Sequence, residues 1–371
     1  MLRNTFFSVH FLLALYISFP ALAQEAVPVF TAGENGYACY RIPAIVTTLK
    51  GTLLAFAEAR RKNCGDSGDI DLVMKRSADG GKTWSEMQVV WDDGGNTCGN
   101  PAPVIDRRTG NVILLSTWNL GEDHEPQIIA GTSKNTRRIF VLRSADEGKS
   151  WSKAREITSD VKLPNWTWYA TGPCNGIQMQ SRPFRGRLVI PCDHIEAGTK
   201  KYFSHTIFSD DGGQTWQLGG TTPTDQVNEC TVAELPGGTL MLNMRNYTSV
   251  RVRQVATSRD GGKSWSALRG DTTLIEPVCQ GSLIWYNEKG RKPFLAFSNP
   301  ASQQSRIRMT VRISYDQGQT WPLKTLVHEG PSAYSNLAIL PNGNLACYYE
   351  GGEKSAYERI LFKELSFEAF R

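Results

Sequence analysis

The sequence predicts an all-β protein, a six-bladed β-propeller that folds as one domain. A short turn motif returns five times, a hairpin pattern returns six times, and strand-like segments at the two ends of the chain complete the last unit. Helical periodicity is nearly absent. A β-solenoid is the alternative repeat architecture, but its coils are much shorter than these units.

The chain starts with a predicted export signal over residues 1–23. Arg3 supplies positive charge, an apolar stretch follows, and residues 21–23 read Ala-Leu-Ala, an A-x-A cleavage site. The apolar stretch is too short for a membrane anchor. We therefore expect an exported protein, periplasmic or secreted. Its single folded domain is expected to span residues 24–371 without a membrane span.

The turn motif has the pattern S-x-D-x-G-x-[ST]-W. Its copies start about 49 to about 67 residues apart, the size of a propeller blade or a small solenoid unit. The Asp can accept backbone hydrogen bonds within the turn, the Gly permits a positive φ, and the Trp can pack under the neighbouring unit. We expect a hairpin fastener, and calcium or ligand binding is the alternative. The copies occupy residues 77–84, 144–151, 209–216, 258–265 and 314–321.

Each unit starts with two short strands around a polar turn that contains Gly, Asn or Asp. These hairpins lie at residues 43–60, 101–119, 176–194, 230–246, 281–299 and 335–351. A third strand precedes each copy of the turn motif, which we call a box. The sixth third strand has no box after it. These strands lie at residues 70–76, 138–143, 201–208, 252–257, 308–313 and 358–365. A fourth, outer strand is expected after each box. Residues 26–30 supply it for the last unit, which closes the ring between the two termini.

Antiparallel pairing places the start of strand 1, the end of strand 2 and the loop before strand 3 at one end of a unit, and the box at the other. The first end is rich in polar and charged residues. Strand 1 starts at Arg41, Asn100, Asn175, Glu229, Gln280 and Tyr334 in the successive units. Strand 2 ends at Arg60, Asn119, Asp193, Arg245, Asn299 and Glu350, and the loops add Asp66 and Arg306. One such arginine would more often be a solvated surface residue. Four of them, interleaved with carboxylates and a tyrosine, predict a receptor for a carboxylate or phosphate, because the guanidinium fork binds such groups bidentately.

Composition excludes several other classes. The net charge of +5 is modest, and the basic residues lack the runs of a nucleic-acid-binding arm. The eight cysteines are compatible with export, but their pairing cannot be deduced from the sequence. No C-x-x-C, H-E-x-x-H or His/Cys cluster predicts a metal site, and no cofactor is expected.

These motifs together resemble the exo-α-sialidases (neuraminidases) of bacterial and animal type. The resemblance rests on R-I-P near the mature N-terminus, the Asp-boxes, the segment E-C-T-V-A-E and the segment A-Y-S, which occur in the family's order. It covers about residues 36–367. The Asp-box alone is a weak signal, since unrelated propellers contain it, whereas the ordered set is specific. The substrates implied are glycans with terminal sialic acid.

The resemblance implies a role for eight residues. Arg41, Arg245 and Arg306 would hold the sialic acid carboxylate, and Glu350 would orient Arg41. Tyr334 would be the nucleophile, Glu229 its base, Asp66 the general acid and base, and Arg60 would lie in the substrate pocket. Two assignments have alternatives in the sequence. The segment "DSGDID" offers Asp69 and Asp71 beside Asp66, and "RIRMTVR" offers Arg308 and Arg312 beside Arg306.

A tyrosine nucleophile suits a sugar that carries its own carboxylate on the anomeric carbon. A carboxylate nucleophile would approach a like charge, whereas a phenol is neutral until Glu229 takes its proton. The nearby arginines are expected to lower the pKa of Tyr334 further. Asp66 would protonate the leaving oxygen and then activate water, so that hydrolysis retains the anomeric configuration.

Two other functions are alternatives. A glycan-binding propeller with an inactive site would be marked by loss of Tyr334, Glu229 or Asp66, and none of these is lost. A trans-sialidase would keep all three and differ in its acceptor pocket. The expected partners are sialylated glycans, with no nucleic acid, and the expected state is a monomer.

Overall fold

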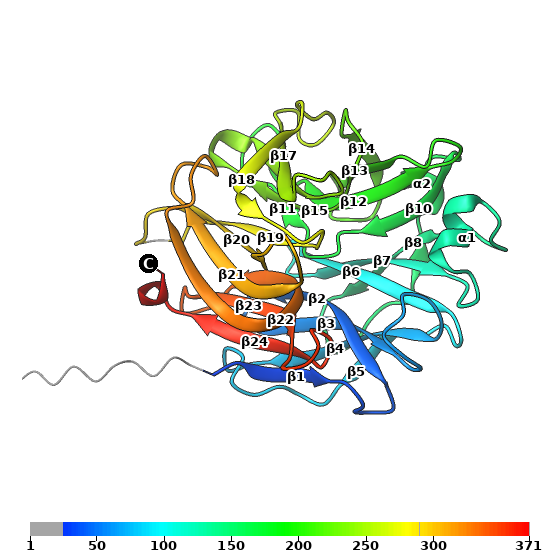
Figure 1. The fold of residues 1–371 in the computed structure, drawn as a ribbon, viewed down its shortest axis with the longest axis horizontal. Coiled ribbons are helices and arrows are strands. Elements are labelled where there is room, and N and C mark those ends of the chain that lie inside the picture. The colour runs from blue at the N-terminus through cyan, green and yellow to red at the C-terminus, as the bar shows by residue number, and fades with distance from the viewer. Residues whose placement is uncertain (1–24, 289, 371) are drawn as a thin grey trace, which may run out of the picture.

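The computed structural model describes residues 25–288 and 290–370, and β-strands form nearly all of its regular structure (Figure 1). The predicted export signal lies outside the described residues. The helical elements of the described part are α1 (Glu125–Ala130), α2 (Thr158–Val161) and the 3-10 turns η1 (Pro236–Gly238) and η2 (Phe367–Ala369). None of these helices has the length and apolar character that a bilayer crossing requires. The all-β prediction is confirmed.

The strands of the described residues form four hydrogen-bonded sheets. Two of these sheets each join two antiparallel groups, one pair of groups through a parallel bridge between Ile70 and Thr97 and the other through one continuous strand. Within the groups, most neighbours in sequence are neighbours in the sheet. The first three groups are β2 (Cys39–Thr47), β3 (Leu53–Arg60), β4 (Ile70–Ser77), β5 (Gln88–Trp91); β6 (Thr97–Ile105), β7 (Val112–Asn119), β8 (Arg138–Ser144), β9 (Arg155–Glu156); and β10 (Trp166–Thr171) with β11 (Ile177–Gln178), β12 (Leu188–Glu196), β13 (Tyr202–Ser209), β14 (Gln217–Thr221). The next three are β15 (Val227–Glu234), β16 (Leu240–Asn246), β17 (Val252–Ser258), β18 (Arg269–Ile275); β19 (Ser282–Tyr286), β20 (Phe294–Pro300), β21 (Ile307–Ser314) and the first half of β22 (Leu323–Ile339); and the second half of β22, β23 (Leu345–Gly351), β24 (Arg359–Leu365), β1 (Val27–Thr31). In Figure 1, β2, β6, β11, β15 and β19 lie toward the middle of the molecule, and β1, β5, β14 and β18 lie farther out.

The first strand differs from the sequence prediction in two of the groups, the third and the sixth. In the third group the strand is split, since β10 pairs with the second half of β12 and β11 with its first half. Pro173 lies between the two pieces, and a proline cannot donate a ladder hydrogen bond. In the fifth and sixth groups no turn separates the outer strand from the next inner one. A single strand, β22, therefore pairs with β21 through its first half and with β23 through its second.

The two termini meet as the sequence predicts. The N-terminal strand β1 pairs antiparallel with β24, which itself pairs with β23. Val29 and Phe30 of β1 are buried in an apolar cluster with Tyr348 and Phe362 of the sixth group. The first strand of the chain thus completes the last group.

Apolar side chains fill the space between successive groups. Strands such as β3, which reads LLAFAEAR, are buried along their whole length because both faces of the sheet are covered. One hydrophobic cluster lies between each pair of neighbouring groups, and another joins the sixth group to the first. The core is therefore a series of layers between sheets.

The repeated box closes its own turn. In the second copy, Ser144 Oγ donates to Asp146 Oδ1 at 2.8 Å, and Ser150 donates to the same carboxylate from its backbone N at 2.9 Å and from Oγ at 2.6 Å. These bonds lower the pKa of Asp146 to about 2. Trp151 packs against Phe56 of the preceding group, with ring centroids 5.8 Å apart. Hydrogen-bond donors of the same turn thus engage the Asp146 carboxylate, as expected if the box fastens its hairpin.

Candidate active site

Strand register places the boxes and the predicted site residues at opposite ends of the groups. In the first group Cys39 pairs with Arg60, and Thr47, at the other end of β2, pairs with Leu53. Leu53 pairs in turn with Ser77, the first residue of a box. Arg41 and Arg60 therefore lie at the end away from the box, and the same register holds in the fourth and sixth groups.

Tyr334, Glu229 and Arg245 form the centre of the site. The Tyr334 hydroxyl donates a short hydrogen bond to Glu229 Oε1. Arg245 Nη1 lies 2.6 Å from Glu229 Oε2 and 3.1 Å from the Tyr334 oxygen. Tyr334 is 6% exposed and Glu229 is 8% exposed, so their contact is largely shielded from water. The phenol proton therefore already points at a carboxylate that can accept it.

The net shift in the pKa of Tyr334 is opposite to the one that the arginines alone predict. Burial and the charge of Glu229 raise this pKa well above the ordinary value for tyrosine, although Arg245, Arg306 and Arg41 lower it. The expected lowering by the arginines is present but outweighed, because the sequence shows the arginines but not the depth at which the phenol is buried. The phenol is held neutral, with its proton on the bond to Glu229.

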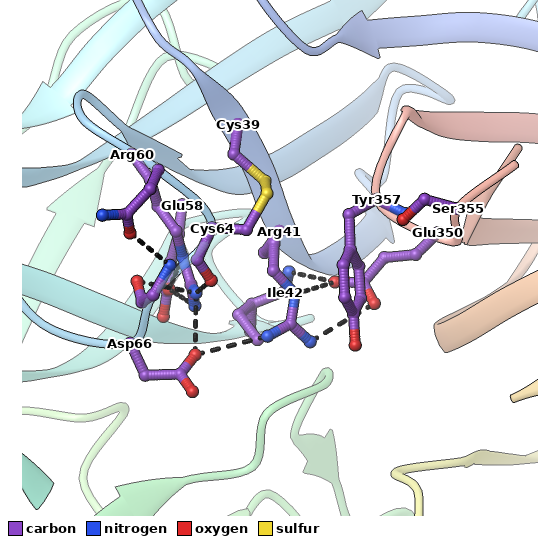
Figure 2. The surroundings of a disulfide bond; sticks show 12 residues. Cys39, Arg41, Ile42, Glu58, Arg60, Cys64, Asp66, Glu350, Ser355 and Tyr357 are labelled. Atoms are coloured by element: carbon purple, nitrogen blue, oxygen red, sulfur yellow. Dashed lines mark hydrogen bonds and ion pairs between the residues drawn. A yellow bond between two sulfur atoms is a disulfide. The ribbon is translucent and has the colours of Figure 1, made fainter. Parts of the chain in front are cut away.

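Arg41 is held on both sides by carboxylates (Figure 2). Its Nε and Nη2 donate to the two oxygens of Glu350 at 3.2 and 3.4 Å, and its Nη1 donates to Asp66 Oδ1 at 3.3 Å. Glu350 is fully buried and also accepts the backbone N–H of Ile42 and Tyr334. Glu350 thus ties β2 to β22 and fixes the guanidinium of Arg41 beside the tyrosine.

Asp66 reaches the site on the loop between β3 and β4. Its side chain is 59% exposed and accepts a hydrogen bond from Arg60 Nη1 at 2.7 Å. Desolvation raises the pKa of Asp66, but the charges of Arg60 and Arg41 outweigh it and hold this pKa below the ordinary value. A disulfide joins Cys64, two residues before Asp66, to Cys39, two residues before Arg41 (Figure 2). It ties this loop to the start of β2.

Arg306 completes a set of three arginines around Tyr334. Its Nη1 donates to the Tyr357 hydroxyl at 2.9 Å, and its Nη2 donates to the carbonyl of Val278 at 3.2 Å. The Cζ atoms of Arg306 and Arg41 lie 5.6 and 5.1 Å from the centroid of the Tyr334 ring. Direct contacts therefore link the eight predicted site residues into one cluster.

The alternatives in the two ambiguous segments lie elsewhere. Asp69 and Asp71 both pair with Arg61, and Asp71 also accepts from Tyr37. Arg308 is half exposed and pairs with Glu329. Arg312 lies within β21 and contacts no site residue among the hydrogen bonds and ion pairs of the described residues. Only Asp66 and Arg306 join the cluster.

Sequence reasoning missed the side chains that support these residues. Glu58 is buried and binds Arg60 through two nitrogens, and its position two residues earlier on the same strand face could have indicated this pair. Tyr357 packs its ring on Arg41, with 4.3 Å between Cζ and the ring centroid. Tyr357 lies in the loop before β24, as Asp66 and Arg306 lie in the loops before the third strands of their own groups. The rule that these loops lie at the site end of a group could therefore have found it.

Asp193 is a further buried acid at this end. The sequence places Asp193 at the end of a second strand, and the resemblance implies no role for it. Neither of its oxygens has a hydrogen-bond partner among the described residues, and burial together with the charge of Glu229 raises its pKa well above the ordinary value. A neutral Asp193 adds no second negative charge beside the carboxylate that accepts the Tyr334 proton.

The chain is similar to known proteins over most of its length. Residues 51–347 match the model of the BNR repeat-like domain. A sialidase of Bacteroides fragilis is 35% identical over 92% of this chain and 65% of its own length. An exo-alpha-sialidase of Aspergillus fumigatus is 34% identical over 79% of this chain and 72% of its own length. The chain thus spans slightly less than two thirds of that bacterial relative.

A solved structure gives the same result. The chain superposes on the Hadza microbial sialidase Hz136 with a TM-score of 0.85 and 32% identity, over 93% of this chain and 69% of that one. The repeat model covers most of the chain, and the relatives extend over nearly all of it. The chain therefore belongs to the sialidase family of BNR-repeat proteins.

Proposed function

We propose that this protein is an exo-α-sialidase, a glycoside hydrolase that removes terminal sialic acids from glycoproteins, glycolipids and oligosaccharides. The observation that carries the proposal is the Tyr334 hydroxyl on Glu229, with Arg245 bridging both and two further arginines around the ring. A phenol with an adjacent base and a triad of guanidiniums matches a sugar that bears a carboxylate on its reacting carbon.

The first step forms a bond between the Tyr334 oxygen and the anomeric carbon. Glu229 takes the phenol proton, which offsets the high pKa that burial gives to Tyr334. The bond from the anomeric carbon to the leaving oxygen breaks, and Asp66 gives that oxygen a proton. The substrate carboxylate lies against Arg41, Arg245 and Arg306.

Asp66 must be protonated for this step, although Arg60 and Arg41 lower its pKa in the structure. A substrate carboxylate at Arg41 offsets part of the positive potential at Asp66 and raises this pKa. In the second step Asp66 takes a proton from water, the water oxygen attacks the anomeric carbon, and the bond to Tyr334 breaks. The proton on Glu229 returns to the phenolate, and two displacements retain the anomeric configuration.

The architecture that supports the site is inferred to be a six-bladed β-propeller. Six antiparallel groups, apolar clusters between successive groups and a terminal strand that completes the last group all support this inference. We further propose that residues 1–23 direct export, to a periplasm or out of the cell, and that the mature enzyme acts as a monomer.

The test is hydrolysis of α2,3- and α2,6-sialyllactose with product analysis by NMR. Free sialic acid released first as the α-anomer supports the proposal. Transfer of sialic acid to added lactose at the expense of hydrolysis would instead identify a trans-sialidase. Binding of sialyllactose without turnover would identify a glycan-binding propeller.

A further inference from the structure

A separate cavity of about 660 Å³ lies in the fifth group, between β21, the start of β22, the end of β18 and the loop 301–306. None of the eight site residues lines it. Its lining includes Arg308 and Arg312, the two arginines of "RIRMTVR" that the site does not use, and Lys324 from the next strand. No acidic residue is among its described lining residues.

Two of these cations face each other across the sheet. Arg312 of β21 and Lys324 of β22 are direct partners in the antiparallel register. Like charges directly opposite each other destabilise a sheet. The pair gains nothing from the fold unless an anion lies between or beside the two groups.

Arg312 is also unsatisfied. It is 8% exposed, its Nη1 is buried without a partner, and no hydrogen bond or ion pair of its guanidinium occurs among the described residues. Asp271 is the acid whose charge acts on Arg312, but its oxygens accept from Trp321 Nε1 at 2.9 Å and from the backbone N of Thr273 at 3.1 Å. An unpaired buried charge is costly, and a bound oxyanion removes that cost.

The rest of the lining suits a sugar better than a bare inorganic ion. Ser302, Gln303 and Thr310 supply hydroxyl and amide groups, and Ile307 and Leu326 supply an apolar wall. Few polar groups on a partly apolar, concave surface are typical of small-molecule sites. The volume is large enough for a monosaccharide with its substituents.

We propose that this cavity is a second binding site, which takes an acidic sugar residue through the oxyanion of a carboxylate or sulfate. The choice of a sugar rests on the proposed function, since the loop 301–306 that lines the cavity also carries Arg306 of the active site. Arg312 and Lys324 would contact the oxyanion, and the hydroxyl and amide groups would contact the ring. Arg308 is half exposed and pairs with Glu329, so it would add positive charge at the rim and make no direct contact.

The test titrates the full-length folded protein with N-acetylneuraminic acid and with N-acetylglucosamine 6-sulfate, followed by NMR. Lys324→Gln and Arg312→Gln are expected to weaken binding of at least one sugar by about tenfold or more, the effect of losing a charge-assisted contact. Lys324 is exposed, so its variant should fold even where Arg312→Gln does not. Lys50→Gln, an exposed lysine in the β2–β3 turn, removes the same charge elsewhere and should leave binding unchanged.

The two sugars separate the carboxylate source from the sulfate source. Unchanged affinity for both sugars in Lys324→Gln would overturn the proposal. A wild-type protein that binds inorganic sulfate at this cavity but neither sugar would also overturn it. The kcat on sialyllactose should stay at the wild-type value in Lys324→Gln. If the wild-type protein does not hydrolyse sialyllactose but binds the sulfated sugar through Lys324, the proposed function fails and the second site stands.

Discussion

At the residue scale, the site is defined by one buried phenol among opposing charges. Burial and the charge of Glu229 raise the pKa of Tyr334, and three arginines lower it. The short bond from the phenol to Glu229 resolves this competition, because the proton can pass to the carboxylate as the oxygen attacks. Tyr334 and Tyr357 both lie against Arg41, but only Tyr334 has a base on its hydroxyl.

The Tyr334→Phe variant tests the nucleophile. It removes one oxygen and keeps the packed ring, so the protein should fold while kcat on sialyllactose falls by several decades. In the wild-type protein a fluorinated sialyl donor should label Tyr334, as shown by peptide mass spectrometry. Tyr357→Phe removes the same atom beside the same arginine and should cost much less. Near-native turnover of Tyr334→Phe, or label on Glu229, would contradict the mechanism.

The Arg245→Lys variant tests the guanidinium fork. The charge remains, but lysine cannot bridge Glu229 and Tyr334 while it holds a carboxylate bidentately. We expect kcat/KM on sialyllactose to fall by at least about tenfold, equivalent to about 1.4 kcal/mol. Wild-type kinetics in this variant would show that the substrate carboxylate binds elsewhere.

At the scale of the element, two devices hold the chain in place at opposite ends of the groups. The boxes close the turns after the third strands, and the disulfide closes the loop that carries Asp66. The boxes act through local hydrogen bonds, whereas the disulfide joins residues 25 positions apart. The first device should affect stability, and the second should affect both stability and catalysis.

The Asp146→Ala variant tests the boxes. The unfolding free energy should fall by about 1 to 3 kcal/mol because turn donors lose their acceptor, while kcat of the folded enzyme is unchanged. The pKa of Asp146 is lowered from 3.8 to about 2 in the folded state. Its contribution is therefore present above about pH 4 and lost as the pH falls through about 2, so the difference in stability between the wild-type protein and the variant should shrink as the pH falls. Denaturant unfolding at pH 7 and pH 3 measures both effects. A loss of kcat without a change in stability would contradict the fastener role.

The Cys64→Ser variant tests the disulfide. The unfolding free energy should fall by roughly 3 kcal/mol, the entropy gained by an unfolded chain freed from a loop of this length. The loop that carries Asp66 is then no longer tied to β2, so kcat should fall as well. A sialoside with a good leaving group needs less help from the acid and should be less affected. Equal losses on good and poor leaving groups would contradict this positioning role.

At the scale of the whole molecule, the site exists because distant strands meet at one end of the groups. Tyr334 and Glu229 are 105 residues apart in sequence, and Arg41 and Glu350 are 309 apart. The pairing of β1 with β24 joins the two ends of the chain beside the strand that carries Glu350. Stability and site geometry therefore depend on the same closure.

The Phe30→Ala variant tests this closure. Phe30 is 1% exposed and packs at 5.1 Å from the Tyr40 ring centroid, just before Arg41. Truncating a buried phenylalanine costs about 3 to 5 kcal/mol. We expect a single unfolding transition at lower denaturant, with activity and near-ultraviolet circular dichroism lost together. A separate unfolding transition at low denaturant, with activity kept, would show that β1 unfolds independently of the other strands.

Much of the fold could be predicted from the sequence because its signals are local. Strand alternation, turn glycines and the five boxes gave the strand order and the completion of the sixth group by residues 26–30, whereas the split of β10 from β11 and the continuity of β22 were missed. The eight site residues could be named from motif order. Glu58 and Tyr357 hold positions that the same strand and loop rules could have indicated, but the contacts by which they support Arg60 and Arg41 depend on side-chain packing that no local pattern shows.

By itself, the sequence determined the all-β class, the repeated units and the residues gathered at one end. Only the tertiary structure decided that Cys39 pairs with Cys64, that Asp66 and not Asp69 or Asp71 meets Arg41, and that the pKa of Tyr334 is raised. The physical reason is range. Turn and strand preferences act between residues a few positions apart, whereas burial and charge act through space. A phenol surrounded by groups from four distant segments has a pKa that no local pattern contains.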